Sequence, residues 1–358
     1  MTDFLVKRDD LHQCRLVESG PVEPGPGQAL LKVESFGLTA NNVTYAVFGG
    51  PPMNYWDFFP CEDGWGRVPM WGFATVAASE VPGVEPDTRM FGYLPPSSYL
   101  LVNPVAVADG AFVDGSPHRA ALPSAYHRYL ATGADPFYRP ETEAMQMLLR
   151  PLFFTSFLID DQLADDGLTA KGPIVISSAS SKTALATAFP LSWRPEARLI
   201  GLTSARNREF VERLGIYQQV VAYEEIDSLP REAATFVDFA GNADTRLAVH
   251  SHYGGALLAS FTVGMTHWDA MIPSGEAELP GPAPAFFFAP DRIVKRGRDW
   301  GRAGLETRVA EAWHPFCDWC AGWLEPIPGE GFEGVLDAYL DVLDGGVPPN
   351  RAHVLTLD

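Results

Sequence analysis

A run of small polar residues with one lysine, residues 177–184 (Ser-Ser-Ala-Ser-Ser-Lys-Thr-Ala), has the composition of a turn that binds phosphate. The run lies between a short apolar segment and a helix-like stretch. Its backbone N–H groups are therefore expected at a helix N-terminus, where anions bind. The predicted phosphate-binding residues are Ser178, Ser180, Ser181, Lys182 and Thr183.

The same run holds no glycine. Turns that bind dinucleotides usually carry glycines, because only glycine lets the backbone approach a pyrophosphate closely. Small serines still admit a phosphate, and the Lys182 ammonium would add a charge. The alternative is that the turn has lost nucleotide binding and only caps a helix.

A second polar set follows the predicted strand 197–203. A carboxylate at this place would bind the ribose 2′-hydroxyl of NAD and repel a 2′-phosphate. The sequence has hydroxyls and guanidiniums there instead, in a chain whose net charge is −19. This pattern favours NADPH, and the alternative is an ordinary solvated helix start. The predicted cofactor residues of this set are Thr203, Ser204, Arg206 and Asn207.

Composition excludes several classes of function. The chain has 358 residues, with 26 Lys and Arg against 45 Asp and Glu. This acidic balance argues against nucleic acids or anionic membranes as partners, because both require clustered cations. The first ten residues carry charges where a signal peptide needs an apolar segment, and no run approaches the roughly 18 apolar residues of a membrane span. We therefore expect a cytoplasmic protein.

The periodicity of the sequence predicts two kinds of structure. Short strands in the first hundred residues, at 28–35, 68–79 and 88–93, are typical of a small β-barrel. Between 173 and 264, five strand-like runs alternate with helix-like runs, which predicts βαβ units and a parallel sheet. Helices at 305–324 and 332–343 and a terminal strand at 351–357 complete the chain. The predicted fold class is α/β.

This order of elements resembles the medium-chain dehydrogenase/reductase superfamily. The resemblance is carried by residues 17–42, by the turn 83–92 (Gly-Val-Glu-Pro-Asp-Thr-Arg-Met-Phe-Gly) and by the run 173–223. Residues 177–184 and 286–301 are similar to one branch, the uncharacterised domain-of-unknown-function 2855 type. The resemblance implies a GroES-like β-barrel catalytic domain, 1–150 and 295–358, and a Rossmann-type doubly wound parallel sheet, 151–294.

The resemblance also implies a zinc-free protein. Zinc-dependent relatives carry a cysteine in the loop that matches 38–42 and a Gly-His-Glu run near 71–73, and this sequence has neither. Structural zinc needs four clustered ligands. The four cysteines do not provide them, and Cys317 and Cys320 share one apolar helix face. No metal site is expected.

The site residues that the resemblance implies lie in a loop and beside strand ends. In the loop 37–45, Tyr45 is the candidate proton donor, with Asn41 and Asn42 as hydrogen-bond donors to a substrate carbonyl. The alternative is that the asparagines only hold the loop. Thr155 matches a position near the nicotinamide. The positions after the fourth and fifth strands of the parallel sheet complete the cofactor set, Phe239, Gly241, Val263 and Gly264.

The resulting hypothesis is an NADPH-dependent, zinc-independent reductase of an activated C=C or carbonyl, with a small-molecule substrate and a possible homodimer. The alternatives are a non-redox enzyme, such as a hydrolase or lyase, and a non-catalytic binding protein. The segment 107–140 is longer than the resemblance requires and is rich in aromatic and cationic residues. It either closes over an acidic or CoA-like substrate, or serves as surface decoration or a subunit contact.

Overall fold

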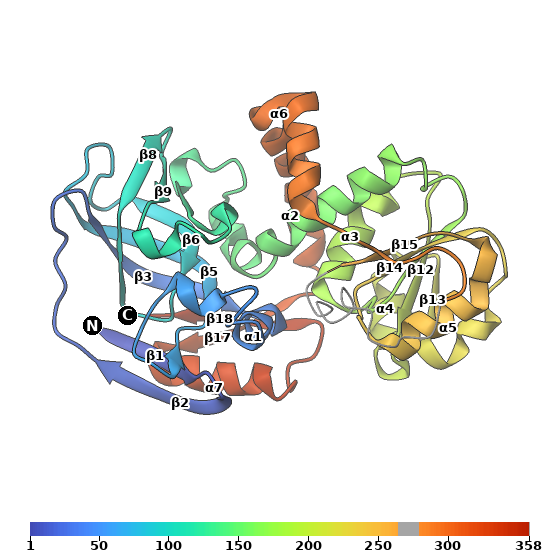
Figure 1. Cartoon of the computed structure of the whole chain (residues 1–358), viewed down its shortest axis with the longest axis horizontal. Helices are drawn as coiled ribbons and strands as arrows, with labels where there is room; N and C mark the ends of the chain where they lie inside the picture. The colour runs from blue at the N-terminus through green and yellow to red at the C-terminus, as the bar shows by residue number, and fades with distance from the viewer. Residues whose placement is uncertain (264–278, 358) are drawn as a thin grey trace. The chain divides into compact units, whose positions relative to one another are not determined.

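The computed structural model describes residues 1–263 and 279–357, which form two compact units (Figure 1). The first unit comprises Met1–Leu148 and Cys320–Asp358, and the second comprises Leu149–Trp319. Residues 295–319, which we expected in the β domain, belong to the second unit. The reason lies in residues 289–320, two helical segments joined at a kink at Gly301. The first segment makes the ion pairs described below, and in the second Trp313 and Phe316 pack on Phe153 within that unit.

The first unit is built on two sheets. A three-stranded sheet has the order β2-β1-β4, and a nine-stranded sheet has the order β17-β18-β3-β5-β6-β10-β9-β8, with β7 also paired to β3. The strands are β1 (Thr2–Lys7), β2 (Asp10–Glu18), β3 (Ala29–Leu38), β4 (Trp65–Gly66), β5 (Met70–Ser79), β6 (Arg89–Leu94), β7 (Tyr99–Val102), β8 (Pro104–Ala108), β9 (Ala111–Asp114), β10 (Arg128–Ala131), β17 (Glu325–Glu330) and β18 (Arg351–Thr356). Helices α1 (Ala40–Val47) and α7 (Gly331–Leu343) belong to the same unit.

Strand β17 was not predicted from the sequence, Glu-Pro-Ile-Pro-Gly-Glu, because prolines interrupt a sheet ladder. The strand pairs only with β18, in parallel, so it lies at the edge of the sheet. Proline lacks an N–H group and is tolerated at such an edge. The segment 107–140 also contributes strands, because β9 and β10 extend the sheet beyond β6.

The second unit contains a six-stranded sheet in which every pairing is parallel, in the order β13-β12-β11-β14-β15-β16. This confirms the parallel sheet predicted from the alternating strands and helices, with one short strand more than we expected. The strands are β11 (Pro173–Ile176), β12 (Arg198–Thr203), β13 (Gln219–Ala222), β14 (Ala234–Asp238), β15 (Leu257–Thr262) and β16 (Ala285–Phe286). The helices are α2 (Glu143–Asp165), which begins in the first unit, α3 (Lys182–Ser192), α4 (Arg208–Leu214), α5 (Ala243–Tyr253) and α6 (Ala289–Cys320).

Helix α3 runs through Pro190 and ends at Ser192, whereas the sequence predicted an end or a kink at the proline. Pro190 stands in the last turn, where the missing N–H removes one hydrogen bond and no further turn follows. The residues of α3 from Ala184 to Leu191 are buried, so packing stabilises the helix more than the proline weakens it.

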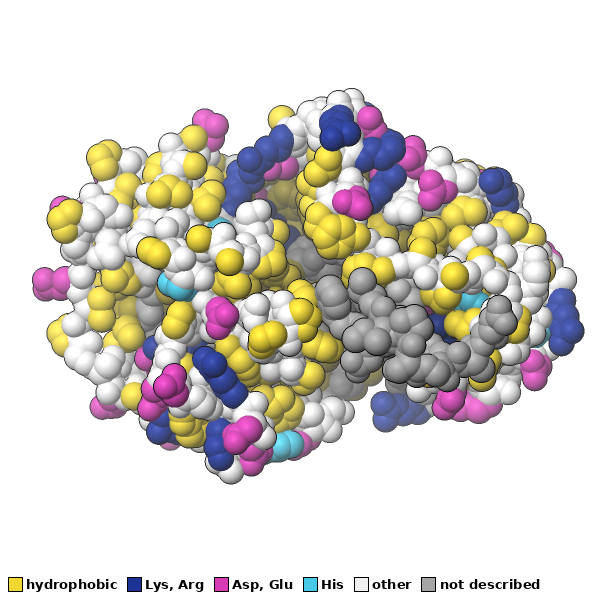
Figure 2. All heavy atoms as spheres, viewed as in Figure 1, with side chains coloured by type: hydrophobic (Ala, Val, Ile, Leu, Met, Phe, Trp, Pro, Cys, Tyr) yellow, Lys and Arg dark blue, Asp and Glu magenta, His cyan; other side chains and the backbone are white. Residues whose placement is uncertain are grey.

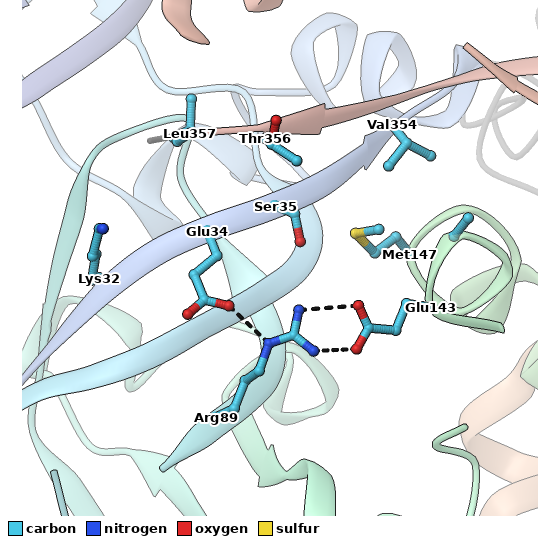
Figure 3. Close-up of a pocket in the computed structure, with 10 residues that line it drawn as sticks. Lys32, Glu34, Ser35, Arg89, Glu143, Met147, Val354, Thr356 and Leu357 are labelled. Atoms are coloured by element: carbon cyan, nitrogen blue, oxygen red, sulfur yellow. Dashed lines mark hydrogen bonds and ion pairs between the residues drawn. The ribbon is translucent and has the colours of Figure 1, made fainter. Parts of the chain in front are cut away.

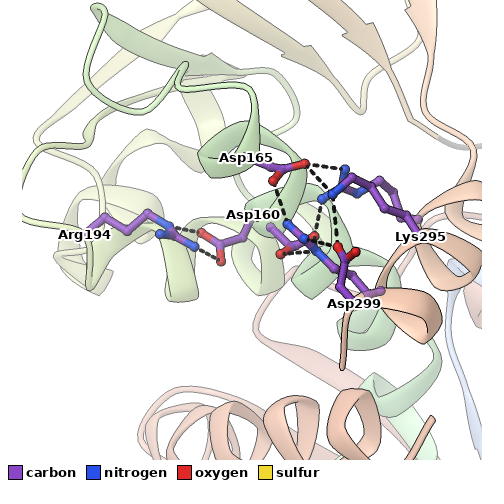
Figure 4. Close-up of polar contacts among 8 residues, drawn as sticks. Asp160, Asp165, Arg194, Lys295 and Asp299 are labelled. Atoms are coloured by element: carbon purple, nitrogen blue, oxygen red, sulfur yellow. Dashed lines mark hydrogen bonds and ion pairs between the residues drawn. The ribbon is translucent and has the colours of Figure 1, made fainter. Parts of the chain in front are cut away.

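Helices α2 and α6 are joined by ion pairs within the second unit (Figure 4). The Asp161 carboxylate lies between the guanidiniums of Arg292 and Arg296, and the Arg296 Nε donates to it at 2.7 Å. Asp165 pairs with the Lys295 ammonium at 3.0 Å. Over α6, Figure 2 shows lysine and arginine side chains mixed with acidic ones. These pairs bind residues 289–299 to α2 and explain why α6 belongs to the second unit.

Candidate functional site

Residues 40–47 form helix α1, although the sequence was interpreted as a loop from 37 to 45. The correction has a local cause, a capping box at the start of the helix. The Thr39 hydroxyl accepts from the Asn41 N–H, and the Asn42 side chain accepts from the Thr39 N–H at 2.9 Å. The helix turns Asn41 and Tyr45 onto one face, four residues apart.

Asn42 is buried, and both ends of its amide bind the backbone. Its Oδ1 takes part in the capping box, and its Nδ2 donates to the Pro69 carbonyl at 2.9 Å. These contacts fasten α1 to the chain just before β5. Asn42 thus holds the helix in place, the alternative that the sequence left open for the two asparagines.

The Tyr45 hydroxyl accepts two hydrogen bonds. Asn41 Nδ2 donates to it at 2.7 Å, and the Trp71 indole N–H donates at 3.4 Å. With both bonds directed at the oxygen, the phenolic proton is the hydroxyl's remaining means of hydrogen bonding, and it is directed at the Tyr126 hydroxyl. Burial raises the pKa of Tyr45 far above its usual range, so the proton stays on the oxygen. The arrangement is that of a fixed proton donor.

Tyr45 belongs to an aromatic group that we call the tyrosine cluster. Its members come from α1, the turn 55–58, β5, β6 and the segment 107–140, and their neighbouring ring centroids lie 4.6–6.4 Å apart. They are Tyr45, Tyr55, Phe58, Trp71, Tyr93 and Tyr126. No spacing in the sequence predicted this group, because its rings are contributed by five separate segments.

Three hydroxyls of the cluster have no partner or only a distant one. Tyr93 is fully buried, and its hydroxyl has no hydrogen-bond partner among the described residues. Tyr55 and Tyr126 face each other at a hydroxyl distance of 3.4 Å, which is long for an O–H···O bond. Burial raises the pKa of Tyr93 and of Tyr126, so the cluster is uncharged at neutral pH. It offers donors in an apolar setting.

In the second unit, the glycine-free turn keeps a glycine-like backbone. Ser178 has a φ of +52°, in the left-handed region that glycine usually occupies. Its N–H donates to the Tyr223 hydroxyl at 2.9 Å, and the Ala179 N–H donates to the Leu202 carbonyl at 2.9 Å. The turn is therefore braced by the chain itself at two of its N–H groups.

The same turn leads into helix α3. The Ser181 side chain is the N-cap and accepts from the Ala184 N–H at 3.2 Å. Lys182 and Thr183 are the first two residues of the helix, so their backbone lies at its positive end. This placement agrees with the helix start that the sequence predicted for the phosphate-binding residues.

The end of β12 meets this turn. Asn207 Nδ2 donates to Ser180 Oγ at 3.0 Å, and Thr203 Oγ1 lies 3.4 Å from the same oxygen. The structure thus brings together three residues from the two predicted cofactor sets. Ser204 Oγ is buried without a hydrogen-bond partner in the described part of the chain, and Arg206 is exposed beside it in sequence.

The other predicted cofactor residues lie at the ends of β14 and β15 or in α2. The N–H groups of Phe239 and Gly241 donate to Ser177 Oγ and to Asp238 Oδ1, respectively, and Val263 is buried. Thr155 is half-buried within α2, and Gly264 lies outside the described residues.

Asp238 organises these loops, a role that the sequence reasoning missed. Its Oδ1 accepts from the Ser177 hydroxyl at 2.7 Å, and its Oδ2 pairs with buried Arg246 at 3.1 Å. The signal in the sequence is an acidic residue directly after a buried strand. Both oxygens of this carboxylate bind other residues in the described part of the chain. Asp238 therefore links the ends of β11 and β14, and we do not assign it to a ligand.

A surface groove of about 480 Å³ lies elsewhere on the first unit, beside β3 and β18 (Figure 3). Its floor is an ion-pair chain in which the Arg89 guanidinium lies between Glu34 and Glu143, with Nε 2.8 Å from the Glu34 carboxylate. Arg89 also stacks on the Phe73 ring at 4.4 Å. The groove's charges neutralise one another, and it contains no residue of the tyrosine cluster.

Within residues 1–263 and 279–357, no three His, Cys, Asp or Glu side chains are grouped to hold a metal ion. The absence of zinc stays a prediction from the sequence. None of the described helices is both long and apolar enough to cross a membrane.

Comparison with known proteins identifies the family. The family model described as "Protein of unknown function (DUF2855)" matches residues 36–348. The chain belongs to the DUF2855 family. This confirms the branch that the residues 177–184 and 286–301 resembled.

Solved structures extend the comparison to the whole chain. CurA from Vibrio vulnificus in complex with NADPH is 12% identical, with a TM-score of 0.61, and the match covers 100% of this chain and 99% of that one. The yhdH oxidoreductase from Salmonella enterica in complex with NADP is 14% identical, with a TM-score of 0.56 and full coverage of both chains. The CurK enoyl reductase is 13% identical, with a TM-score of 0.58 over 100% of this chain and 99% of that one. No curated protein matches the sequence. The likeness confirms the predicted α/β fold of the medium-chain reductases.

Proposed function

We propose that this DUF2855 chain is an NADPH-dependent, zinc-independent reductase that acts on an activated C=C or carbonyl group. The observation that carries the proposal is the Tyr45 hydroxyl, which receives hydrogen bonds from Asn41 and Trp71 inside an aromatic cluster. The fold, shared with structures that hold NADPH or NADP, supports it.

Reduction of a conjugated carbonyl requires one hydride and one proton. NADPH, when bound, supplies the hydride. The Tyr45 O–H then donates its proton to the substrate anion that hydride addition leaves. The two donors on the Tyr45 oxygen stabilise the phenolate that forms, and a water proton restores the hydroxyl. Asn41 acts here as a positioning residue, because its amide is bound to Tyr45.

The residues of the second unit fit a phosphorylated dinucleotide. Ser178 keeps the left-handed backbone of a phosphate-binding turn, and Lys182 and Thr183 begin helix α3. The buried Ser204 Oγ lacks a partner among the described residues, and Arg206 is exposed. We assign the pyrophosphate to the α3 N-terminus with Lys182, and the 2′-phosphate to Ser204 and Arg206.

One observation favours the alternative of a protein that has lost the dinucleotide. The Tyr223 hydroxyl and the Leu202 carbonyl already bind the Ser178 and Ala179 N–H groups, which a phosphate would otherwise use. Titration of NADPH fluorescence with purified protein separates the two functions. Saturable binding supports the reductase, and its absence supports a non-redox or binding role.

The proposal predicts the behaviour of Tyr45→Phe. Removal of the proton donor is expected to lower kcat by roughly a hundredfold or more, since general acid catalysis contributes about 10²–10⁴. NADPH affinity and the folded state are expected to stay unchanged, because only one hydroxyl is lost. Steady-state kinetics and the NADPH titration measure both quantities. Tyr99→Phe, a change of the same kind outside the cluster, is the control, and equal activity of the two variants would remove Tyr45 from the mechanism.

A further inference from the structure

Three cationic or titratable residues of the segment 107–140, Arg119, His118 and His127, are not arranged to hold an acidic substrate. Arg119 is 1% exposed and pairs with buried Asp114, with Nε 3.1 Å from Oδ2. The His118 ring is bound to the Phe58 carbonyl at 3.2 Å. Burial lowers the pKa of His127, so this ring is neutral at physiological pH. The buried charge of Arg119 is thus already neutralised by Asp114 and does not attract a carboxylate, a phosphate or CoA.

The same segment sends an aromatic ring into the tyrosine cluster. Tyr126 contacts Tyr93 at 4.8 Å, Phe58 at 5.2 Å and Trp71 at 5.9 Å between ring centroids. It stands in a single 3-10 turn, Ser124–Tyr126, whose backbone hydrogen bonds are local. Movement of this ring breaks its ring contacts and its hydroxyl contact to Tyr55, but no bond of a sheet or an α-helix.

The cluster carries more polarity than a packing core requires. Phenylalanine would bury the same rings without a hydroxyl, and a buried hydroxyl without a partner costs free energy. Tyr93 nevertheless keeps such a hydroxyl at the centre of the cluster, and the Tyr45 proton is directed at Tyr126, so it becomes available to a ligand when the Tyr126 ring moves aside. Two donors among aromatic faces match a ligand that has one carbonyl oxygen on a flat, uncharged frame.

We propose that the tyrosine cluster binds the substrate, an uncharged planar aromatic enone, and that Tyr126 is the ring that moves aside and then covers it. The inference rests on the proposed reductase function for the chemistry, and on the cluster for the substrate class. Two members of the cluster are half-buried, Trp71 and Tyr126, and so is the adjacent Asn41. The ligand therefore enters on the side of these three residues. The members of the cluster carry no charge, so nothing in it attracts an anionic acyl-CoA ester, and such esters are expected to turn over more slowly than the aromatic enone.

The test compares substrates in the presence of NADPH. The aromatic enone 4-phenyl-3-buten-2-one is expected to have a kcat/KM at least about tenfold above those of 2-hexenal and crotonyl-CoA. Tyr126→Ala should raise the KM for the aromatic enone by about tenfold, the effect of losing its ring contacts. It should leave the KM for 2-hexenal nearly unchanged. Tyr99→Ala controls for loss of a tyrosine elsewhere in the unit.

A second measurement separates this inference from the reductase itself. Calorimetric binding of the saturated ketone 4-phenylbutan-2-one needs no turnover, and it should weaken in Tyr126→Ala but not in Tyr99→Ala. Such binding without any NADPH oxidation would overturn the reductase and leave the aromatic site standing. Equal turnover of crotonyl-CoA and the aromatic enone would overturn the aromatic site and leave the reductase standing. Neither binding nor turnover would overturn both.

Discussion

Ser178 adopts a backbone conformation that most side chains avoid, at the one turn where a dinucleotide would need it. Its φ of +52° costs roughly 1–2 kcal/mol for a residue with a Cβ atom. The bond from its N–H to the Tyr223 hydroxyl offsets part of that cost. At the scale of the residue, the turn thus keeps the shape of a glycine turn by means of a tyrosine on the neighbouring segment.

Two cations are assigned to different phosphates, so their removal should have different effects. Arg206→Ala is expected to weaken NADPH by about ten- to a hundredfold and to leave NADH unchanged, since only NADPH carries the 2′-phosphate. Lys182→Ala is expected to weaken both cofactors to a similar degree, because both carry the pyrophosphate. Fluorescence titration of each variant with each cofactor measures the four affinities.

The fold of these variants should persist, since Arg206 is exposed and alanine is a good helix former at position 182. Glu209→Ala, an exposed change on the next helix, serves as the control. If Arg206→Ala has the NADPH affinity of the wild type, Arg206 is only a solvated residue at the start of a helix and does not bind the 2′-phosphate.

At the scale of the element, the sequence shows the residues that cap a helix, but it does not show where the helix ends or whether a loop stands in its place. Thr39 and Asn42 form a capping box that the sequence displays, yet glycine and asparagine neighbours suggested a loop. Pro190 suggested a helix end two residues before the actual one. Helix α1 forms because of its local capping box, whereas α3 continues past Pro190 because its residues are buried, and burial depends on residues far away in the chain.

The ion pairs between α2 and α6 lead to a stability prediction. Asp161→Asn removes the carboxylate between Arg292 and Arg296, all of them about 90% buried. Two buried guanidiniums then keep fewer counter-charges, and the free energy of unfolding should fall by about 3 kcal/mol. Urea denaturation followed by circular dichroism measures the change.

Asp299→Asn is the matched control in the same cluster. Its carboxylate is far more exposed, at 39%, and pairs with Lys295 and Arg296 in contact with solvent. Exposed pairs contribute little, so its urea midpoint should match that of the wild type. A wild-type midpoint for Asp161→Asn as well would show that the cluster does not stabilise the second unit.

At the scale of the whole molecule, buried phenols set the alkaline limit of stability. Ten of the eleven tyrosines have a raised pKa, with burial the first cause in each case. Burial raises the pKa of Tyr129 to about 12 and that of Tyr253 to about 12. Above pH 10 the unfolded chain loses phenolic protons that the folded chain retains, so stability is full below pH 10 and falls as the pH rises toward 12.

A pH titration that records phenolate absorbance and circular dichroism together tests this. Most phenolate should appear in one cooperative step that coincides with loss of structure. Gradual ionisation of most tyrosines near pH 10, with the fold intact, would contradict the burial of the phenols.

The sequence predicted the parallel sheet, because each strand and each helix has a hydrophobic period that can be recognised from its own residues. It also placed the turn 177–184 before a helix. The tyrosine cluster could not be predicted from the sequence, because Tyr55, Trp71 and Tyr93 have no shared spacing and the cluster forms only when five separate segments have assembled. Tyr45 was reachable only through a family resemblance, and its hydrogen bonds from Asn41 and Trp71 came from the structure.

The pairing of β18 has a consequence for synthesis of the protein on the ribosome. Strand β3 is made early, but the edge at Ser35–Leu38 receives its partner, residues 353–356, only after the whole second unit has been synthesised. By then every strand of the parallel sheet has emerged. The nascent chain therefore carries an open strand edge while its second unit is being made, the kind of edge to which other chains and chaperones bind.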